Sequence, residues 1–371
     1  MLDRWFRWLC HRYRKNIIKI VTQHELVETN VFLRNTWYVA ASHSEIDRDL
    51  KSITILGERI VLYRREDGLP VALEDACPHR KLPLSRGLLT GDTIECGYHG
   101  LTFDCTGTCV KAPTQDKIPP TAKVHSYPVV DRWEFVWIWM GNPNLAVEEK
   151  IIHIDNYDDP SWGKTGTNTL TCACNYLYLV DNLLDPFHVA WIHRTSLVSD
   201  GADHISSKID TSNDGIINSR WMYNQDPPPF YAPLIQFEGK CDRLQHYEAR
   251  YPSIAINKSI FTPAGTGGPD RTYQDNTFIA ISYGFLTPVD ENTTHYHWFQ
   301  QRNSDPDSKK VTQSISDGLR KIFIEDKDVV EAIHDGMANK ATQNINLGLD
   351  AGPLYFRREL EQMINAEHDE S

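Results

Sequence analysis

Four potential metal ligands lie close together between residues 77 and 99. Cys77 and His79 form a Cys-x-His pair, and Cys96 and His99 form a Cys-x-x-His pair after sixteen intervening residues. Thiolate sulfur and imidazole nitrogen are side-chain atoms that bind zinc and iron in proteins. Two short pairs on separate loops can present all four atoms to one small metal centre. The segment therefore predicts a metal site.

The composition of each pair helps to distinguish two kinds of metal centre. A structural zinc ion with two cysteines and two histidines is one possibility, but zinc fingers usually pair cysteine with cysteine and histidine with histidine. A Rieske-type two-iron two-sulfur cluster takes two thiolates on one iron and two imidazoles on the other. One ligand of each type in each loop suits that cluster. Pro78, Gly97 and Gly100 supply tight turns around it. We therefore predict a cluster that carries single electrons.

A second group of polar residues lies in the segment DNLLDPFHVAWIH, residues 181–193. It contains Asn182, Asp185, His188 and His193. Residues five apart on a regular helix are separated by about 140° and cannot both reach one ion. The segment therefore predicts either a helix that ends between the two histidines or a π-bulge. Two imidazoles, with one carboxylate from elsewhere, would form the ligand set of a non-haem Fe(II) site.

The missing carboxylate is predicted from the periodicity of the last long helical segments. Apolar residues recur there at steps of three, four or seven: Ile315, Leu319, Ile322, Val329, Ile333 and Met337. Asp326 occupies the open position near the centre of this stripe. A carboxylate among aliphatic side chains is costly unless it is paired or binds a metal, so Asp326 is the predicted third ligand; a salt bridge to a buried arginine is the alternative. The same geometry predicts that four neighbouring carboxylates point away from the stripe: Asp317, Glu325, Asp328 and Glu331.

The elements that would position these residues fall into two parts. From 33 to 147, short β-branched runs such as SITIL and RIVLYRR alternate with turn residues, which predicts an all-β domain with the Cys-His pairs on its loops. From 148 to 371, strand signals such as FIAISYGFL alternate with helical segments. This pattern predicts an antiparallel sheet with long helices. The predicted fold class is therefore α+β, with residues 1–32 as an N-terminal extension.

Composition excludes some classes of protein. The chain has 371 residues and a formal net charge of −12, which argues against general nucleic-acid binding. The longest apolar run, residues 135–140, is too short to span a bilayer, so no integral membrane segment is predicted. The eight cysteines are scattered, which favours metal use in a reducing cytoplasm over a disulfide scaffold. The basic, aromatic N-terminus lacks the features of a secretory signal; an amphipathic helix on a membrane or partner and a solvated tail both remain open.

Together, these motifs resemble those of the Rieske non-haem iron aromatic oxygenases, and most closely the vanillate O-demethylase oxygenase type. The resemblance runs from NTWYVAA at residue 35 to the last helix. It rests on four segments that match in order and character: CPHR…CGYHG, DNLLDPFHVAWIH, KIFIEDKDVVEA and LDAGPLYFRR. It implies two ligand sets: Cys77, His79, Cys96 and His99 for the cluster, and His188, His193 and Asp326 for a mononuclear Fe(II).

The resemblance also implies an assembly and two further roles. Members of the family are usually head-to-tail trimers, with the cluster of one subunit near the iron of the next, so a homotrimer is expected. Asp185 would bridge a cluster histidine, His99 of the neighbouring subunit, to His188 and orient both rings on the electron path. A helix cap is the alternative role for Asp185. Asn182 would line the same junction.

The activity implied is that of a terminal oxygenase component. A small aromatic substrate and O₂ would react at the iron, with electrons from a separate NAD(P)H-dependent reductase, with or without a ferredoxin. The sequence contains no dinucleotide-binding, flavin or plant-type ferredoxin motif that would replace this partner. O-demethylation through methyl hydroxylation is the first expectation, and ring or methyl hydroxylation of another aromatic or alicyclic molecule is the alternative.

Two other classes of function and the substrate contacts remain to be weighed. An electron-transfer Rieske protein would need the cluster ligands alone, and a zinc-binding structural protein would be colourless. The segment DPPPFYAPL makes Phe230 and Tyr231 candidate substrate contacts. No single Arg or Lys can be named as an anchor for a substrate carboxylate.

Overall fold

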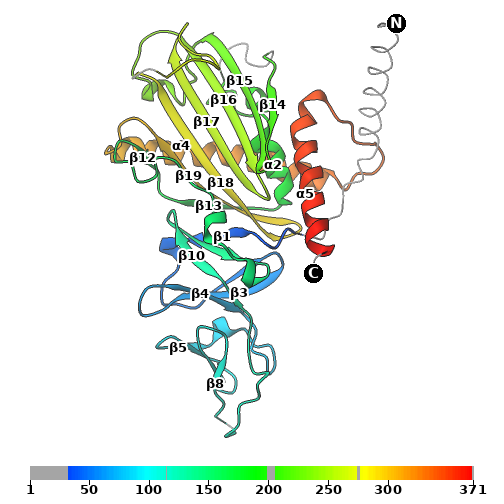
Figure 1. Ribbon diagram of the computed structural model, residues 1–371. Coiled ribbons are helices and arrows are strands. Elements are labelled where there is room, and N and C mark those ends of the chain that lie inside the picture. Colours follow the sequence, from blue (N-terminus) through cyan, green and yellow to red (C-terminus); the bar gives the residue numbers. More distant parts are fainter. Residues whose placement is uncertain (1–31, 114, 199–204, 274–275, 370–371) are drawn as a thin grey trace, which may run out of the picture.

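The computed structural model describes residues 32–113, 115–198, 205–273 and 276–369. The predicted N-terminal extension lies outside the described residues except for its last residue. The fold is α+β, with three small antiparallel sheets in the first half of the chain and one eight-stranded sheet with helices in the second (Figure 1). Among the described residues, no helix combines the length and the apolar character needed to cross a membrane.

The first half consists of short strands connected by tight turns. Its sheets have the strand orders β1-β11-β10, β2-β3-β4-β9 and β5-β6-β7-β8. Leu56 and Gly57 both have positive φ, at 51° and 80°, as a two-residue hairpin loop between β2 and β3 requires. The strands are β1 (Trp37–Ser42), β2 (Lys51–Ile55), β3 (Glu58–Arg64), β4 (Pro70–Glu74), β5 (Leu88–Thr90), β6 (Thr93–Glu95), β7 (Thr102–Phe103), β8 (Cys109–Lys111), β9 (Ser126–Tyr127), β10 (Val129–Arg132) and β11 (Phe135–Trp139).

The second half is built on a large antiparallel sheet with the order β12-β19-β18-β17-β16-β15-β14, in which β13 also pairs with β19. Its strands are β12 (Gly163–Lys164), β13 (Asn168–Cys172), β14 (Lys208–Thr211), β15 (Gly215–Gln225), β16 (Cys241–Arg250), β17 (Ile254–Pro263), β18 (Phe278–Asp290) and β19 (Thr293–Arg302). Its helices are α2 (Tyr176–Leu184), α3 (Val189–Ile192), α4 (Lys309–Gly336) and α5 (Ala351–Asp369). Short 3₁₀ turns complete the chain: η1 (His43–Glu45), η2 (Leu84–Arg86), η3 (Pro143–Leu145), η4 (Glu148–Lys150), η6 (Ala232–Leu234) and η7 (Gly348–Asp350).

The two faces of the large sheet have different partners, because side chains alternate along each strand. Helices α2, α4 and α5 pack on one face (Figure 1), where the ring of Phe323 in α4 lies 5.1 Å from that of Trp298. The β1-β11-β10 sheet packs on the other face, where the ring of Phe135 lies 5.3 Å from that of Phe285. The part of the large sheet around β18 and β19 is therefore covered on both faces.

The loops that carry the Cys-His pairs lie at the far end of the molecule from these helices. Cys77 follows β4, and Cys96 lies between β6 and β7. In Figure 1, β5 and β8 occupy one end, the sheets of β3, β4, β1 and β10 lie next, and α2 and α4 lie beyond them. The two groups of predicted ligands are therefore well separated within one chain.

Candidate metal centres and active site

The two Cys-His loops are built as two copies of one turn. In each, the amide of the cysteine donates to the carbonyl five residues later, and the amide four residues later donates back to the cysteine carbonyl, at 2.8–3.0 Å. The residues at this fourth position, Lys81 and Gly100, both have positive φ, at 57° and 70°. Lys81 adopts a backbone conformation that residues other than glycine rarely occupy, so the backbone hydrogen bonds of the loop must hold it there.

The four side chains are sorted into a thiol pair and an imidazole pair. Cys77 and Cys96 are buried and interact with each other, and burial raises the pKa of the Cys77 thiol. The rings of His79 and His99 lie 4.6 Å apart, and Nδ1 of His99 is buried without a hydrogen-bond partner. Two thiols beside two imidazoles, one with an orphaned ring nitrogen, fit a two-iron cluster with one pair on each iron.

A single zinc ion fits these four side chains less well. Among the described residues, only His188, His193 and Asp326 bring three such ligand atoms within 4.8 Å of one another. The pairing of thiol with thiol and imidazole with imidazole is the arrangement that a Rieske cluster requires.

The two histidines of the second constellation flank a very short helix. Helix α2 ends at Leu184 because Pro186 cannot continue it. Helix α3 begins after His188 and ends before His193, whose φ and ψ of −101° and 39° are no longer helical. The amide of His193 still donates to the carbonyl of Val189 at 3.1 Å, as in an α-turn. The helix therefore ends just before the second histidine, as one of the two predictions required, and no π-bulge is needed to bring the two imidazoles together.

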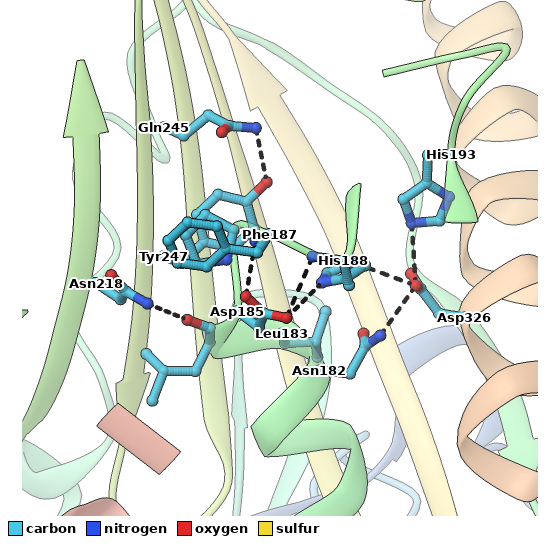
Figure 2. Close-up of polar contacts among 12 residues, drawn as sticks. Asn182, Leu183, Asp185, Phe187, His188, His193, Asn218, Gln245, Tyr247 and Asp326 are labelled. Carbon is cyan, nitrogen blue, oxygen red and sulfur yellow. Dashed lines mark hydrogen bonds and ion pairs between the residues drawn. The ribbon is translucent and has the colours of Figure 1, made fainter. Parts of the chain in front are cut away.

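Asp326 lies between the two imidazoles, in the middle of α4. Its Oδ1 lies 3.0 Å from Nε2 of His193 and 3.5 Å from Nε2 of His188 (Figure 2). The side chain of Asp326 is only 4 % exposed, so it meets the two imidazoles away from bulk water. Asp326 forms no salt bridge with an arginine among the described residues, since its contacts there are with the two histidines and Asn182. Two imidazoles and one carboxylate are the donor set of a non-haem Fe(II) site.

Asn182 and Asp185 approach this group from the end of α2. Nδ2 of Asn182 donates to Oδ1 of Asp326 at 3.2 Å. Asp185 accepts from the amides of Phe187 at 2.7 Å and His188 at 3.2 Å, so it does cap the turn that leads into α3. Its Oδ2 also lies 3.9 Å from Nδ1 of His188, a buried nitrogen without a hydrogen-bond partner. The cap and a position beside the ligand ring therefore coexist.

Glu325 corrects one prediction made from the sequence. It was expected to point away from the site, but its Oε2 lies 2.8 Å from Nδ1 of His193. The imidazole of His193 contacts Asp326 through Nε2 and Glu325 through Nδ1, so two consecutive carboxylates of α4 reach the two nitrogens of one ring. Burial lowers the pKa of His193, but hydrogen bonds with Asp326 and Glu325 outweigh this and raise it. Burial lowers the pKa of His188.

A narrow cavity of about 60 Å³ borders the three ligands on the side of the large sheet. Tyr231, one of the two candidate substrate contacts of the DPPPFYAPL segment, lines it. Phe230 does not; its ring packs on α4 at Gly318, where a Cβ would lie only 2.4 Å away. Arg243 also lines the cavity and is fully buried. Arg243 could not be recognised from the sequence, because polar and apolar residues are mixed on both faces of β16 and no apolar alternation marks the inner face.

A second hollow, of about 340 Å³, borders Asp185 and His188 on the other side. Val329, Ile333 and Met337 line it, and Ile333 is 47 % exposed. The predicted stripe on α4 is therefore wrong beyond Asp326, since Val330 is the buried residue there. Val329 and Met337 are partly buried, so the described residues cover the apolar side of the last turns of α4 only in part.

Each half of the chain matches a known protein family. Residues 36–128 match the Rieske 2Fe-2S domain family, and residues 172–366 match the vanillate O-demethylase oxygenase C-terminal domain family. The iron–sulfur subunit of the toluene-4-sulfonate monooxygenase system of Comamonas testosteroni is 37% identical over 91% of this chain and 99% of its own length. The vanillate O-demethylase oxygenase subunit of a Pseudomonas species is 32% identical over 91% and 97%.

Solved structures show the same architecture. The crystal structure of dicamba monooxygenase bound to 3,6-dichlorosalicylic acid has a TM-score of 0.84 and 30% identity, over 91% of this chain and 99% of that one. The same enzyme has also been solved with non-haem iron and dicamba, at a TM-score of 0.76 and 28% identity, over 92% and 100%. The fold, the two donor sets and these matches agree. The chain therefore belongs to the Rieske non-haem iron oxygenases of the vanillate O-demethylase type, oxidoreductase components that combine a Rieske 2Fe-2S cluster with a catalytic non-haem iron and oxidise aromatic substrates.

Proposed function

We propose that this oxygenase component oxidises a methyl group of a small aromatic substrate, with removal of a methoxy methyl group as the first reaction to test. The observation that supports this most is the buried group of His188, His193 and Asp326 beside a narrow cavity with aromatic walls. Relatives named as vanillate and dicamba O-demethylases favour demethylation. The 37% identity to a toluene-4-sulfonate monooxygenase subunit keeps hydroxylation of a ring or ring methyl as the second candidate.

We assign the metals to the two donor sets described above. Cys77, His79, Cys96 and His99 would hold the cluster, and His188, His193 and Asp326 the catalytic iron. When bound, these metals supply single electrons and O₂ activation for insertion of oxygen into a C–H bond.

The neighbouring polar residues would hold the ligands of the catalytic iron in position. Glu325 accepts from Nδ1 of His193, which leaves Nε2 of that ring free to act as a ligand. Asn182 restrains Oδ1 of Asp326. The near-complete burial of His193 and Asp326 keeps their ligand atoms away from bulk water.

We propose that the cluster serving this iron comes from a second copy of the chain in a head-to-tail homotrimer. Within one chain the cluster loops lie at one end, and the sheets of β1, β3, β4 and β10 separate them from α2 and α4 at the iron site (Figure 1). The hollow beside Asp185 is open and apolar, with Ile333 47 % and Ile345 79 % exposed. A rotation that closes on itself would cover each hollow with the cluster loops of the next subunit. Asp185 would then connect His188 to the neighbour's His99.

We further propose the division of the chain at residues 147 and 148 and a separate reductase. The three small sheets lie before this point and the large sheet after it, which supports one domain for the cluster and one for the iron.

The exposed ring of His79 leaves the cluster loops accessible to an external electron donor, an NAD(P)H-dependent reductase with or without a ferredoxin. Among the described residues no cysteine forms a disulfide, which supports placement in a reducing cytoplasm.

Metal analysis tests the assignment of the two donor sets. Anaerobically purified protein should contain about three irons and two acid-labile sulfides per chain, and dithionite should produce a Rieske-type paramagnetic resonance signal. Zinc in place of iron would contradict the oxygenase assignment, and two irons alone would leave an electron carrier.

Product analysis then separates the two candidate reactions. With a reductase, NADH and O₂, the protein should convert a methoxybenzoate to formaldehyde and the phenol in equal amounts, and one O₂ and one NADH should be consumed for each. Oxidised product without formaldehyde, from a methylated ring that has no methoxy group, would favour hydroxylation.

A further inference from the structure

We infer that Arg243 is an anchor for an oxyanion on the substrate, so that the protein selects aromatic monoanions, carboxylates or sulfonates, over neutral aromatics. This inference deepens the proposed function and rests on it for the position of the substrate. Arg243 would be the cationic anchor that no pattern in the sequence identifies.

Arg243 is a buried cation with few partners. It lies in β16, and its residue is 1 % exposed. Its Nη1 donates to the carbonyl of Leu197 at 2.9 Å, whereas its Nε is buried without a hydrogen-bond partner. The guanidinium carbon lies 5.2 Å from the centre of the Phe261 ring. Among the described residues, no carboxylate forms an ion pair with this guanidinium.

The nearest acidic residue in the sequence is already engaged elsewhere. Asp242 points to the opposite face of β16, because side chains alternate along a strand. Its carboxylate accepts from the amides of Asn224 at 2.9 Å, Gly265 at 2.7 Å and Gly267 at 3.0 Å. Asp242 therefore stabilises the loop after β17 and leaves the charge of Arg243 uncompensated.

An uncompensated buried guanidinium is expensive and needs an explanation. An arginine stays protonated in proteins, and burying its charge without a partner is strongly unfavourable. Burial lowers the pKa of Arg243, and the ionisable groups whose charge would counteract this are the hydroxyls of Tyr231 and Tyr247 and the thiol of Cys241, all of which are neutral at physiological pH. An anionic ligand would supply the missing partner, and the planar guanidinium suits two oxygens of a carboxylate or sulfonate.

The position of Arg243 connects this charge to the reaction site. The cavity that it lines also borders His188, His193 and Asp326, so one molecule in the cavity can contact both. The amide of Leu197 donates to the carbonyl of His193 at 3.0 Å, which ties the segment held by Arg243 to a proposed iron ligand. An oxyanion on Arg243 would therefore orient the rest of the molecule towards the iron site.

The remaining walls and the size of the cavity favour a single ring. Leu319, Ile322 and Phe323 of α4 provide an apolar wall. The cavity volume is about 60 Å³, whereas one water needs roughly 10–15 Å³ on this scale. The space therefore corresponds to a handful of water molecules, enough for one ring with small substituents.

Calorimetric titration of the oxidised, metal-loaded protein tests the inference without turnover. The probes are 4-methylbenzoate, 4-methylbenzenesulfonate and the neutral isostere 4-methylbenzamide. At least one of the two anions should bind about 30-fold or more tightly than the amide, because a buried charge gains an oppositely charged partner. A preference for only one anion would identify the oxyanion as carboxylate or sulfonate. Equal affinity for amide and anions would overturn the inference.

Variants identify the residue responsible. Arg243→Gln should weaken binding of the preferred anion by about 30-fold or more and remove the preference over the amide. Arg271→Gln, which removes an exposed guanidinium from the loop after β17, is the control for net charge and should leave the preference unchanged. Lys258 also borders the cavity, although strand alternation directs its side chain to the other face of the sheet. Loss of anion binding in Lys258→Gln, with Arg243→Gln unaffected, would overturn the assignment.

Two further measurements separate a binding role from a structural one. Without ligand, Arg243→Gln should melt at the same temperature as the wild type or higher, since an unpaired buried charge has been removed. If that variant does not fold, Arg243→Lys keeps the charge but loses the planar pair of donors, and should show intermediate anion affinity. Unchanged anion affinity in a folded variant of either kind would overturn the inference.

Failure of the Arg243 anchor can be distinguished from failure of the proposed function. If anions bind through Arg243 but no O₂-dependent product forms with a reductase, the proposed function fails and the anchor stands. If neutral aromatics bind and react as well as anions, the proposed function stands and the anchor fails.

Discussion

The two proposed metal centres of this chain are built in opposite ways. The cluster ligands lie within 23 residues of sequence, from 77 to 99, on loops whose backbone bonds repeat almost identically. Tyr98 beside them is 60 % exposed. The iron ligands His193 and Asp326 are 133 residues apart in sequence and almost fully buried. An electron-accepting centre must be reachable by partner proteins, whereas an oxygen-activating centre must exclude water.

This difference implies that the two centres can be damaged separately. The cluster loops depend on local hydrogen bonds and the metal itself, and they lie far from α4 (Figure 1). The iron site depends on the packing of α4 against the large sheet, where Phe323 contacts the rings of Tyr296 and Trp298. A change at either centre should leave the metal content of the other intact.

Asp326→Ala provides the strongest test of this independence. It removes the carboxylate between the two imidazoles, so catalytic iron and product formation should fall by more than about 100-fold, since even residues that only support ligands cost 10–100-fold. The brown colour and sulfide content should persist. Iron analysis and the visible spectrum measure both. Asp317→Ala, an exposed carboxylate of the same helix, is the matched control; unchanged iron in Asp326→Ala would show that another carboxylate is the ligand.

Cys96→Ser is the reciprocal change. It removes a thiolate from the cluster, so the brown colour and the reduced paramagnetic signal should disappear and reductase-driven turnover should fall to background. About one iron per chain should remain at the histidine site, because its ligands lie outside the cluster loops. Cys105→Ser alters a nearby half-buried thiol and should leave the colour unchanged. Loss of all iron in Cys96→Ser would mean that the two centres fold as one unit.

The candidate ligands of both centres could be predicted from the sequence, because each depends on the local structure of one segment. Short-range spacing identified all four cluster candidates, because each loop is a local structure. Spacing also identified both histidines, and helical periodicity identified Asp326, since each depends on one element. The structure brings these three together.

Residues whose importance depends on the packing of several elements could not be predicted. Glu325 was misplaced because its contact depends on how α3 lies beside α4. Arg243 was missed because β16 shows no apolar alternation that would mark its inner face. The end of the α4 stripe was predicted as buried although Ile333 is 47 % exposed, because periodicity cannot show where a covering element stops.

Asp185→Asn tests whether the separation of the two centres is bridged between subunits. The amide oxygen can still accept from the amide of Phe187, so the turn into α3 should remain and both metals should stay bound. Turnover should fall by about 10–100-fold or more, because the negative charge beside Nδ1 of His188 is lost. Rapid-mixing measurement of cluster oxidation in the presence of substrate and O₂ locates the defect. Full activity would remove this residue from the electron path and favour its role as a cap alone.

Glu325→Gln should have the smallest effect and best resolves how the buried centre is held. Glutamine keeps the length of the side chain and can still accept from Nδ1–H of His193, but its charge is lost, so the ring should remain oriented while its basicity falls. Iron affinity should fall by about 10-fold, at the weak end of the effects of such supporting residues, with the cluster spectrum unchanged. Competition with a chelator measures the affinity, and Asp328→Asn, an exposed neighbour on α4, is the control. A loss as large as that in Asp326→Ala would instead place Glu325 among the ligands themselves; no loss would mean that packing alone orients His193, as backbone bonds alone shape the cluster loops.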